Sequence, residues 1–205
     1  MDSENLDVGN LSRHTLLLGD IKEPKVKGLA RRLNSVSPHA VVKGLIYSFP
    51  PKDEELRNLV QGYGVIIECT GSDDVLGHLE RFEWNDEKLF LSLSLGLNAR
   101  RLYCFASSGS CFPKQIFTSQ IQPWLQKDLD ENEGRPLPRE GIGCWHPVFP
   151  ARADDVWLFS AAAAKVIDEF IALRPPEPVL IVFEQEAHGS VFSGLRRIAA
   201  GAAYG

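Results

Sequence analysis

Gly64-Val-Ile-Ile-Glu68-Cys69-Thr70 is a short, uninterrupted apolar stretch that follows the turn-forming residues Gly62 and Tyr63. A run of this length without polar alternation is typical of a strand buried on both faces, as in a parallel sheet. The next apolar side chains recur at helical spacing behind Ser72, a candidate helix cap. A strand followed directly by a helix predicts an α/β fold.

Similar patterns extend in both directions along the chain. Strand and helix alternate through the first half, so we expect right-handed crossovers and a mostly parallel sheet. Residues 107–150 are rich in Gly and Pro and are expected to be an irregular, crossover-type loop. The tail from residue 199 is weakly specified. The patterns predict helices that begin near Asp20–Glu23, Asp53, Ser72 and Asp154, and strands over 41–49, 64–69, 89–95, 102–106 and 179–183.

Length and charge limit the classes of function. The chain has 205 residues, which fits a single domain over 1–205. Its net charge is −5 and it has no long basic run, which argues against nucleic acid or an anionic membrane as a partner. The polar, acidic start is unlike a signal peptide, and the apolar stretches are too short to span a bilayer. We therefore expect a cytoplasmic location.

The opening of the chain carries the most informative pattern. Asp2-Ser-Glu4-Asn-Leu-Asp-Val-Gly-Asn10-Leu-Ser-Arg13-His14 is followed by Asp20-Ile-Lys-Glu-Pro24-Lys25 and an amphipathic helix. This order resembles the ThiF/MoeB/HesA family, which shares its adenylating fold with the ubiquitin-activating enzymes. A single Asn-Leu-Ser-Arg match is common, and the resemblance depends on order and spacing together.

The resemblance implies a Rossmann-like domain that uses ATP and Mg²⁺. By family pattern, Asp2 would hold the ribose, Asn10 and Arg13 would contact phosphates, and Lys25 would contact the triphosphate. Such cations have a clear physical purpose. A carboxylate that attacks the α-phosphorus must overcome repulsion between anions, and fixed positive charges offset it.

A second match lies at Glu68-Cys69-Thr70, similar to the family's strand end Asp-Cys-Thr. The family then has a magnesium-binding Asp, whereas Gly71 occupies that place here. Asp73 and Asp74 follow at the start of the next helix, and Asp73 is the candidate substitute. Two alternatives stay open: the metal site is lost, or the acidic residue only favours the helix N-terminus.

A third match concerns a nucleophilic thiol. Many relatives carry a cysteine in a loop before a small-residue-rich helix, where it forms a thioester with the activated protein. Cys144 occupies such a loop, and Cys111 is the alternative. A reactive cysteine needs thiolate character and access, which His146 and Arg152 would favour.

The glycine-rich nucleotide loop of this family is not found. It would lie about 20 residues before Asp2, and no G-x-G-x-x-G occurs in the chain. We therefore expect a partial domain that lacks the first strand, the glycine loop and the first helix.

The implied function is adenylation of the C-terminal carboxylate of a ubiquitin-like or sulfur-carrier protein, followed by thioester formation. Two alternatives are a catalytically inactive binding module and a dinucleotide-binding fragment of an oxidoreductase. The family also implies a homodimer, and an unfinished sheet edge would favour that or a complementing chain.

Overall fold

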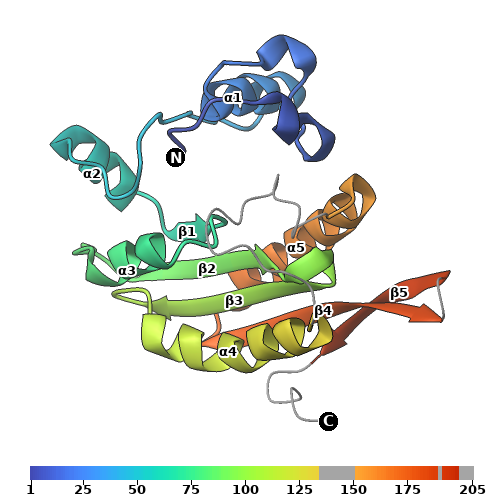
Figure 1. Cartoon of the computed structure of the whole chain (residues 1–205). Coiled ribbons are helices and arrows are strands. Elements are labelled where there is room, and N and C mark those ends of the chain that lie inside the picture. Colours follow the sequence, from blue (N-terminus) through green and yellow to red (C-terminus); the bar gives the residue numbers. More distant parts are fainter. Residues whose placement is uncertain (134–150, 189–190, 199–205) are drawn as a thin grey trace.

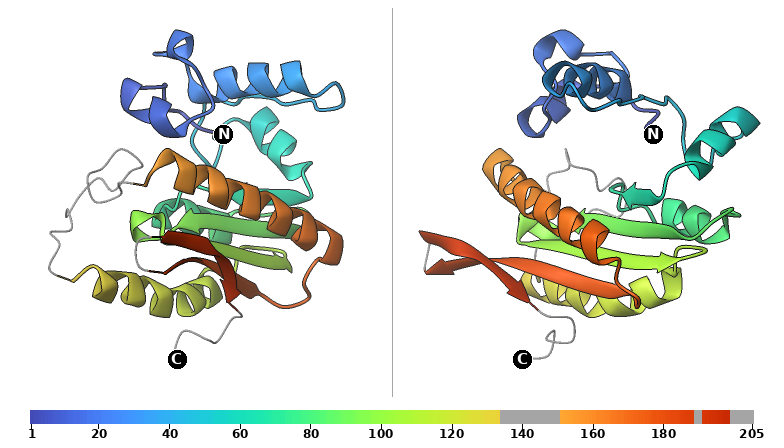
Figure 2. Two further views of the ribbon diagram at one scale, coloured as in Figure 1. Left: turned by 90° about the vertical axis from the view of Figure 1, so that its right-hand side faces the viewer. Right: turned by 180° about the vertical axis from the view of Figure 1, so that it is seen from behind.

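The structure is a computed structural model that describes residues 1–133, 151–188 and 191–198 (Figure 1). A five-stranded sheet carries α5 on one face and α3 and α4 on the other, which gives three layers (Figure 2). The residues before α2 form a helical lobe that contacts the rest through η1 and α5. With η for 3-10 helices, the elements are η1 (Val8–Arg13), η2 (Leu18–Asp20), α1 (Lys25–Val36), α2 (Glu54–Gln61), β1 (Val65–Glu68), α3 (Asp73–Arg81), β2 (Lys88–Leu95), η3 (Leu97–Ala99), β3 (Arg101–Gly109), α4 (Lys114–Glu131), α5 (Ala153–Leu173), β4 (Val179–His188) and β5 (Val191–Ile198).

The sheet has the order β1-β2-β3-β4-β5. Of the described strands, β1 and β2 run parallel, with Val65 opposite Leu89, and the three other pairs are antiparallel. The predicted α/β fold is confirmed, but the expectation that most strands run parallel is wrong for this part of the chain. The short η3 segment joins β2 to β3, and a connection of this length suits antiparallel neighbours, because parallel strands need a long crossover.

The alternation of side chains along β2 divides the core in two. Leu89 and Leu91 pack with Phe159 of α5 on one face of the sheet. Phe90 faces the other way and packs in a second cluster with Trp124 of α4. The alternation predicted for residues 89–95 is therefore confirmed, and helices cover both faces of the strand.

The helix α4 was not predicted, since residues 107–150 were expected to be irregular. That expectation is wrong over Lys114–Glu131, and residues 134–150 lie outside the described part of the chain. Pro123 lies inside the helix, and it weakened the helical signal. One face of the helix is buried at the spacing of successive turns, through Phe117, Ile121, Trp124 and Asp128.

The strand predicted over Val41–Phe49 is also wrong. Asn34 of α1 donates its Nδ2 to the Val42 carbonyl oxygen at 2.9 Å and accepts the Val42 N–H at 2.8 Å. At Gly44, a Cβ would lie 2.4 Å from the carbonyl oxygen of Val26, so the backbone packs tightly against the start of α1. The segment therefore packs along α1. No described strand pairs with it, and Asn34 satisfies the backbone groups of Val42 instead.

Local signals at two other helices were interpreted correctly. Asp53 accepts the Leu56 N–H at 3.0 Å and begins α2. The predicted helix near Asp154 is α5, which ends where Arg174 adopts a left-handed conformation before two prolines. Neither α5 nor another helix in the described ranges has the length and apolar character needed to cross a membrane.

A buried arginine joins β3, β4 and α4. Arg101 has no exposed side-chain surface and donates to Asp128, to Glu184 and, at 2.6 Å, to Glu131. Tyr103 donates its hydroxyl to the second carboxylate oxygen of Asp128 at 2.5 Å. Burial disfavours the charge, but the bonds to Glu131 and Asp128 outweigh it and raise the pKa of Arg101. This network holds the end of α4 against the sheet.

Candidate functional site

The opening segment of the chain folds back on itself. Residues 2–7 run antiparallel to residues 20–25 and form an isolated bridge between Asn5 and Pro24. Three backbone hydrogen bonds join the two segments. The Leu6 N–H donates to the Glu23 carbonyl oxygen at 2.8 Å, and the N–H groups of Lys22 and Lys25 donate to the carbonyl oxygens of Leu6 and Glu4, each at 3.0 Å. The start of α1 therefore lies beside the acidic opening of the chain.

Three charged side chains and an imidazole lie in this neighbourhood. Lys25 forms an ion pair with Glu4, and the side chain of Lys25 is 14% exposed whereas that of Glu4 is 70% exposed. Asp2 accepts the Glu4 N–H at 2.8 Å. Burial and the nearby charge of Lys25 lower the pKa of His14, while Asp2 and Asp20 oppose the shift. Because Lys25 and Asp2 both act on His14, these two predicted site residues share one neighbourhood.

His14 lies in the same neighbourhood. A lone histidine with no paired ligand spacing predicts only an ordinary surface or helix-end role, so a role of His14 in the site is a further prediction. Its Nδ1 accepts the Leu16 N–H at 3.1 Å, so the neutral ring carries its proton on Nε2. Its position directly after the Asn-Leu-Ser-Arg segment was the signal available in the sequence.

Asn10 and Arg13 both lie in η1. The Oδ1 of Asn10 accepts the Asp7 N–H at 3.1 Å, and Asp7 in turn caps the helix through the Val8 N–H. This capping box uses the Asn10 carbonyl oxygen, so its amide nitrogen is the atom left to donate. Arg13 is the last residue of η1, and the role of its guanidinium stays a prediction.

The carboxyl end of β1 is closed by a turn around Glu68. The buried carboxylate of Glu68 accepts hydrogen bonds from the backbone and hydroxyl of Thr70, from Gly71 N–H at 2.9 Å and from Ser92 Oγ at 2.9 Å. Gly71 has φ of 61°, a conformation that glycine adopts without strain. Glycine in place of the family's aspartate therefore suits the geometry of this turn.

Asp73, the candidate magnesium ligand, begins α3. Its carboxylate lies 3.2 Å from the Lys114 ammonium, which also donates to the Asp73 carbonyl oxygen at 3.1 Å. Across the described ranges no three His, Cys, Asp or Glu side chains gather in a group that could hold a metal ion. The ion pair gives Asp73 a different partner, and its metal role stays a prediction.

The thiols differ in environment. Cys144 lies outside the described residues. Cys111 is exposed and lies between β3 and α4. Burial raises the pKa of the Cys104 thiol to about 12. Cys69 is exposed like Cys111, but desolvation by the protein atoms around its thiol and the nearby charge of Glu68 raise its pKa to about 11. The Cys104 and Cys69 thiols stay protonated near neutral pH, so the choice between Cys111 and Cys144 stays open.

No protein-family model matches the sequence. Among curated proteins, the chain is similar to the ATP-dependent ubiquitin transferase-like protein Cap2 of Enterobacter hormaechei subsp. hoffmannii (strain UCI 50), with 39% identity over 191 residues. The match covers 93% of this chain and 31% of Cap2, so the chain spans about a third of the length of that relative.

Solved structures show the same architecture. Escherichia coli MccB with ATP matches at a TM-score of 0.55 and 10% identity, over 98% of this chain and 55% of that one. MccB with succinimide matches at 0.56 and 11%, over 97% and 55%. Selenomethionine PaaA matches at 0.51 and 12%, over 97% and 63%. At these identities the likeness shows the fold alone.

The fold and these similarities define the class. The resemblance predicted from the sequence is confirmed, and the chain has the ThiF-type fold that it shares with MccB. In sequence, the chain is similar to the ubiquitin transferase-like Cap2.

Proposed function

We propose that this chain is part of an ATP-dependent enzyme that adenylates the C-terminal carboxylate of a ubiquitin-like or sulfur-carrier protein. The observation that carries the proposal is the gathering of Lys25, Asp2 and His14 where residues 2–7 pair with residues 20–25. The 39% identity to Cap2, whose name describes an ATP-dependent ubiquitin transferase-like protein, supports the same activity.

The side chains at this place suit a nucleotide. Lys25 offers a compact positive charge at the first residue of α1, where the helix dipole also attracts anions. Its partner Glu4 is largely exposed and can turn into solvent when a phosphate group takes its place. Asp2 can accept a ribose hydroxyl, and Nε2 of His14 can donate.

In the proposed reaction, bound ATP supplies an electrophilic α-phosphorus and a pyrophosphate leaving group. Lys25 and Arg13 offset the repulsion between the incoming carboxylate and the phosphates. Asn10 donates its amide N–H groups to phosphate oxygens, while its carbonyl oxygen stays in the capping box. These side chains orient the phosphates and stabilise their negative charge, and none of them needs to exchange a proton.

A second step would form a thioester. The Cys144 thiolate would attack the acyl carbonyl, and the acyl–phosphate bond would break with AMP leaving. Cys111 is the alternative nucleophile, since it is an exposed thiol. Asp73 is kept as the candidate Mg²⁺ ligand, but no step is derived through the metal because its carboxylate pairs with Lys114. A homodimer or complementing chain and a cytoplasmic location complete the proposal.

ATP–pyrophosphate exchange tests the first step. The full-length protein should exchange label between pyrophosphate and ATP only when its ubiquitin-like partner is present. In the double variant Arg13→Ala/Lys25→Ala, the exchange rate should fall at least about a hundredfold. The exposed Arg32 of α1 provides a matched control, because Arg32→Ala removes a guanidinium that makes no described ion pair. Undiminished exchange in the double variant would refute the assigned roles.

A further inference from the structure

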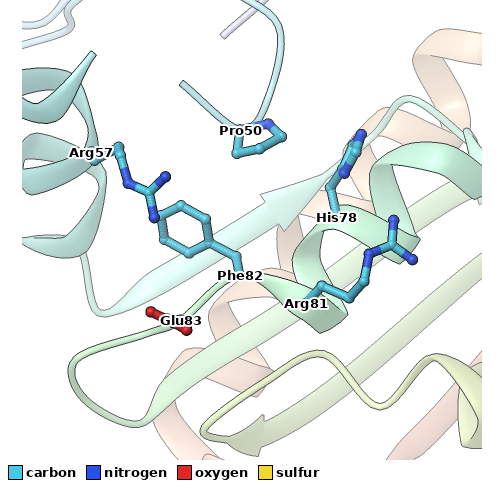
Figure 3. Close-up of a pocket in the computed structure, with 6 residues that line it drawn as sticks. All are labelled: Pro50, Arg57, His78, Arg81, Phe82 and Glu83. Carbon is cyan, nitrogen blue, oxygen red and sulfur yellow. The ribbon is translucent and has the colours of Figure 1, made fainter. Parts of the chain in front are cut away.

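A hollow lies between α2 and α3, and its lining includes no residue of the opening segment. It has a volume of about 280 Å³ and is open to solvent (Figure 3). None of the residues that line it belongs to the candidate nucleotide site. The lining consists of Pro50, Arg57, His78, Arg81, Phe82 and Glu83.

Arg57 and Arg81 bring two positive charges to this hollow. In the described part of the chain neither guanidinium has an ion-pair partner, unlike Arg101 and Arg197, which each bind carboxylates. The Arg57 guanidinium lies over the Phe82 ring, 5.1 Å from its centroid. Stacking of this kind holds the plane of the group and leaves its N–H edge free to donate.

The local sequence of α3 places the second guanidinium. Arg81 folds back over Gly77 one turn earlier, where an added Cβ would lie 3.3 Å from both terminal nitrogens of Arg81. His78 follows Gly77 and lines the same hollow, so an imidazole lies beside the guanidinium (Figure 3). Glu83 contributes the one carboxylate among the six lining residues, which leaves the hollow with an excess of positive charge.

We infer that this hollow is a binding site for a phosphate-bearing anion, separate from the adenylating site. Arg81 ends α3, whereas Asp73 begins it, and nine helical residues separate the two ends by about 12 Å. The Arg57 guanidinium offers forked N–H donors on one side of the hollow, and the Arg81 guanidinium with the His78 imidazole offers donors on the other side (Figure 3). The whole chain has a net charge of −5, which repels anions, so the attraction at this hollow comes from the nearby guanidiniums and imidazole.

The test is an NMR titration of the full-length protein that follows the His78 ring signals with inorganic pyrophosphate. We expect saturable shifts, and at least about tenfold weaker binding in Arg57→Ala/Arg81→Ala. Since Arg57 and Arg81 are exposed, this variant should keep the melting temperature of the parent. Lys25→Ala and Arg32→Ala should leave the His78 shifts unchanged, which separates this site from the proposed nucleotide site.

Glu83→Gln gives an independent readout. Removal of the carboxylate should tighten pyrophosphate binding about twofold to fivefold, since it removes repulsion without opening the hollow. Acetate should bind more weakly than pyrophosphate. The inference is overturned by static His78 signals, by equal affinity in the double-arginine variant, or by equal affinity for acetate.

Discussion

Glu4 and Lys25, 21 residues apart in the chain, form an ion pair across the antiparallel contact between the opening segment and the start of α1. The lysine is largely enclosed and the glutamate largely exposed. The ammonium of Lys25 is therefore held by its surroundings, whereas the carboxylate of Glu4 can turn into solvent.

Replacing that counterion should favour an incoming anion. We expect Glu4→Gln to strengthen ATP binding about twofold to fivefold, because an exposed ion pair contributes up to about 1 kcal/mol. Calorimetric titration of the full-length protein measures the change. Weaker ATP binding in this variant would mean that Glu4 itself takes part in binding.

The state of His14 should make stability depend on pH. Its pKa is lowered in the folded protein, so the unfolded chain binds a proton first as the pH falls. The corresponding stability is fully present above the unfolded pKa of about 6.5 and is lost as the pH falls below it towards the folded pKa. Urea unfolding at neutral and mildly acidic pH should show that His14→Gln loses less free energy of unfolding on acidification than the wild type. Equal losses would show that another group causes the pH dependence of stability.

Replacement of the buried Arg101 should lower the free energy of unfolding. Arg101→Met leaves the buried carboxylate of Asp128 without its cation, whereas Glu184 keeps its ion pairs with Arg196 and Arg100, and we expect about 3–5 kcal/mol less stability. Arg100 provides the control, since it pairs with the same acidic side of the network but is half exposed. Arg100→Met should lose at most about 1 kcal/mol by denaturant unfolding. Similar losses for both variants would contradict the central role of Arg101.

Gly96 should be intolerant of a side chain. A Cβ there would lie 2.2 Å from Oδ2 of Asp128, so Gly96→Ala must displace a carboxylate that Arg101 and Tyr103 hold. We expect about 1–3 kcal/mol of destabilisation. Gly19→Ala meets no atom within 4 Å and should change stability by less than about 0.5 kcal/mol. A neutral Gly96→Ala would show that the network readily rearranges.

Elements whose signals are local were predictable. The apolar run before Thr70 is β1, and the Asp53 cap begins α2, because the pattern and the capping side chain act within a few residues. The segment Val41–Phe49 has strand-like composition, but a strand also requires a neighbour, which sequence patterning cannot supply. β5 was missed for the converse reason, since its pairing with β4 gives it its structure.

In the candidate site, too, local patterns were readable from the sequence and contacts between distant segments were not. Order and spacing along the chain predicted that Asp2 and Lys25 serve one site, and this stays a prediction. In the structure the charges of both residues act on the pKa of His14. The pairing of Glu4 with Lys25 depends on a fold-back of the chain that no periodicity reveals. The roles of Arg13 and Cys144 stay predictions.

The affinity of the full-length protein for ATP, compared between Lys25→Ala and the matched control Arg32→Ala, tests the central claim most directly. We predict that calorimetric titration gives at least about tenfold weaker binding for Lys25→Ala and wild-type binding for Arg32→Ala. Equal affinity in the wild type and Lys25→Ala would contradict the assignment of the opening segment as the nucleotide site.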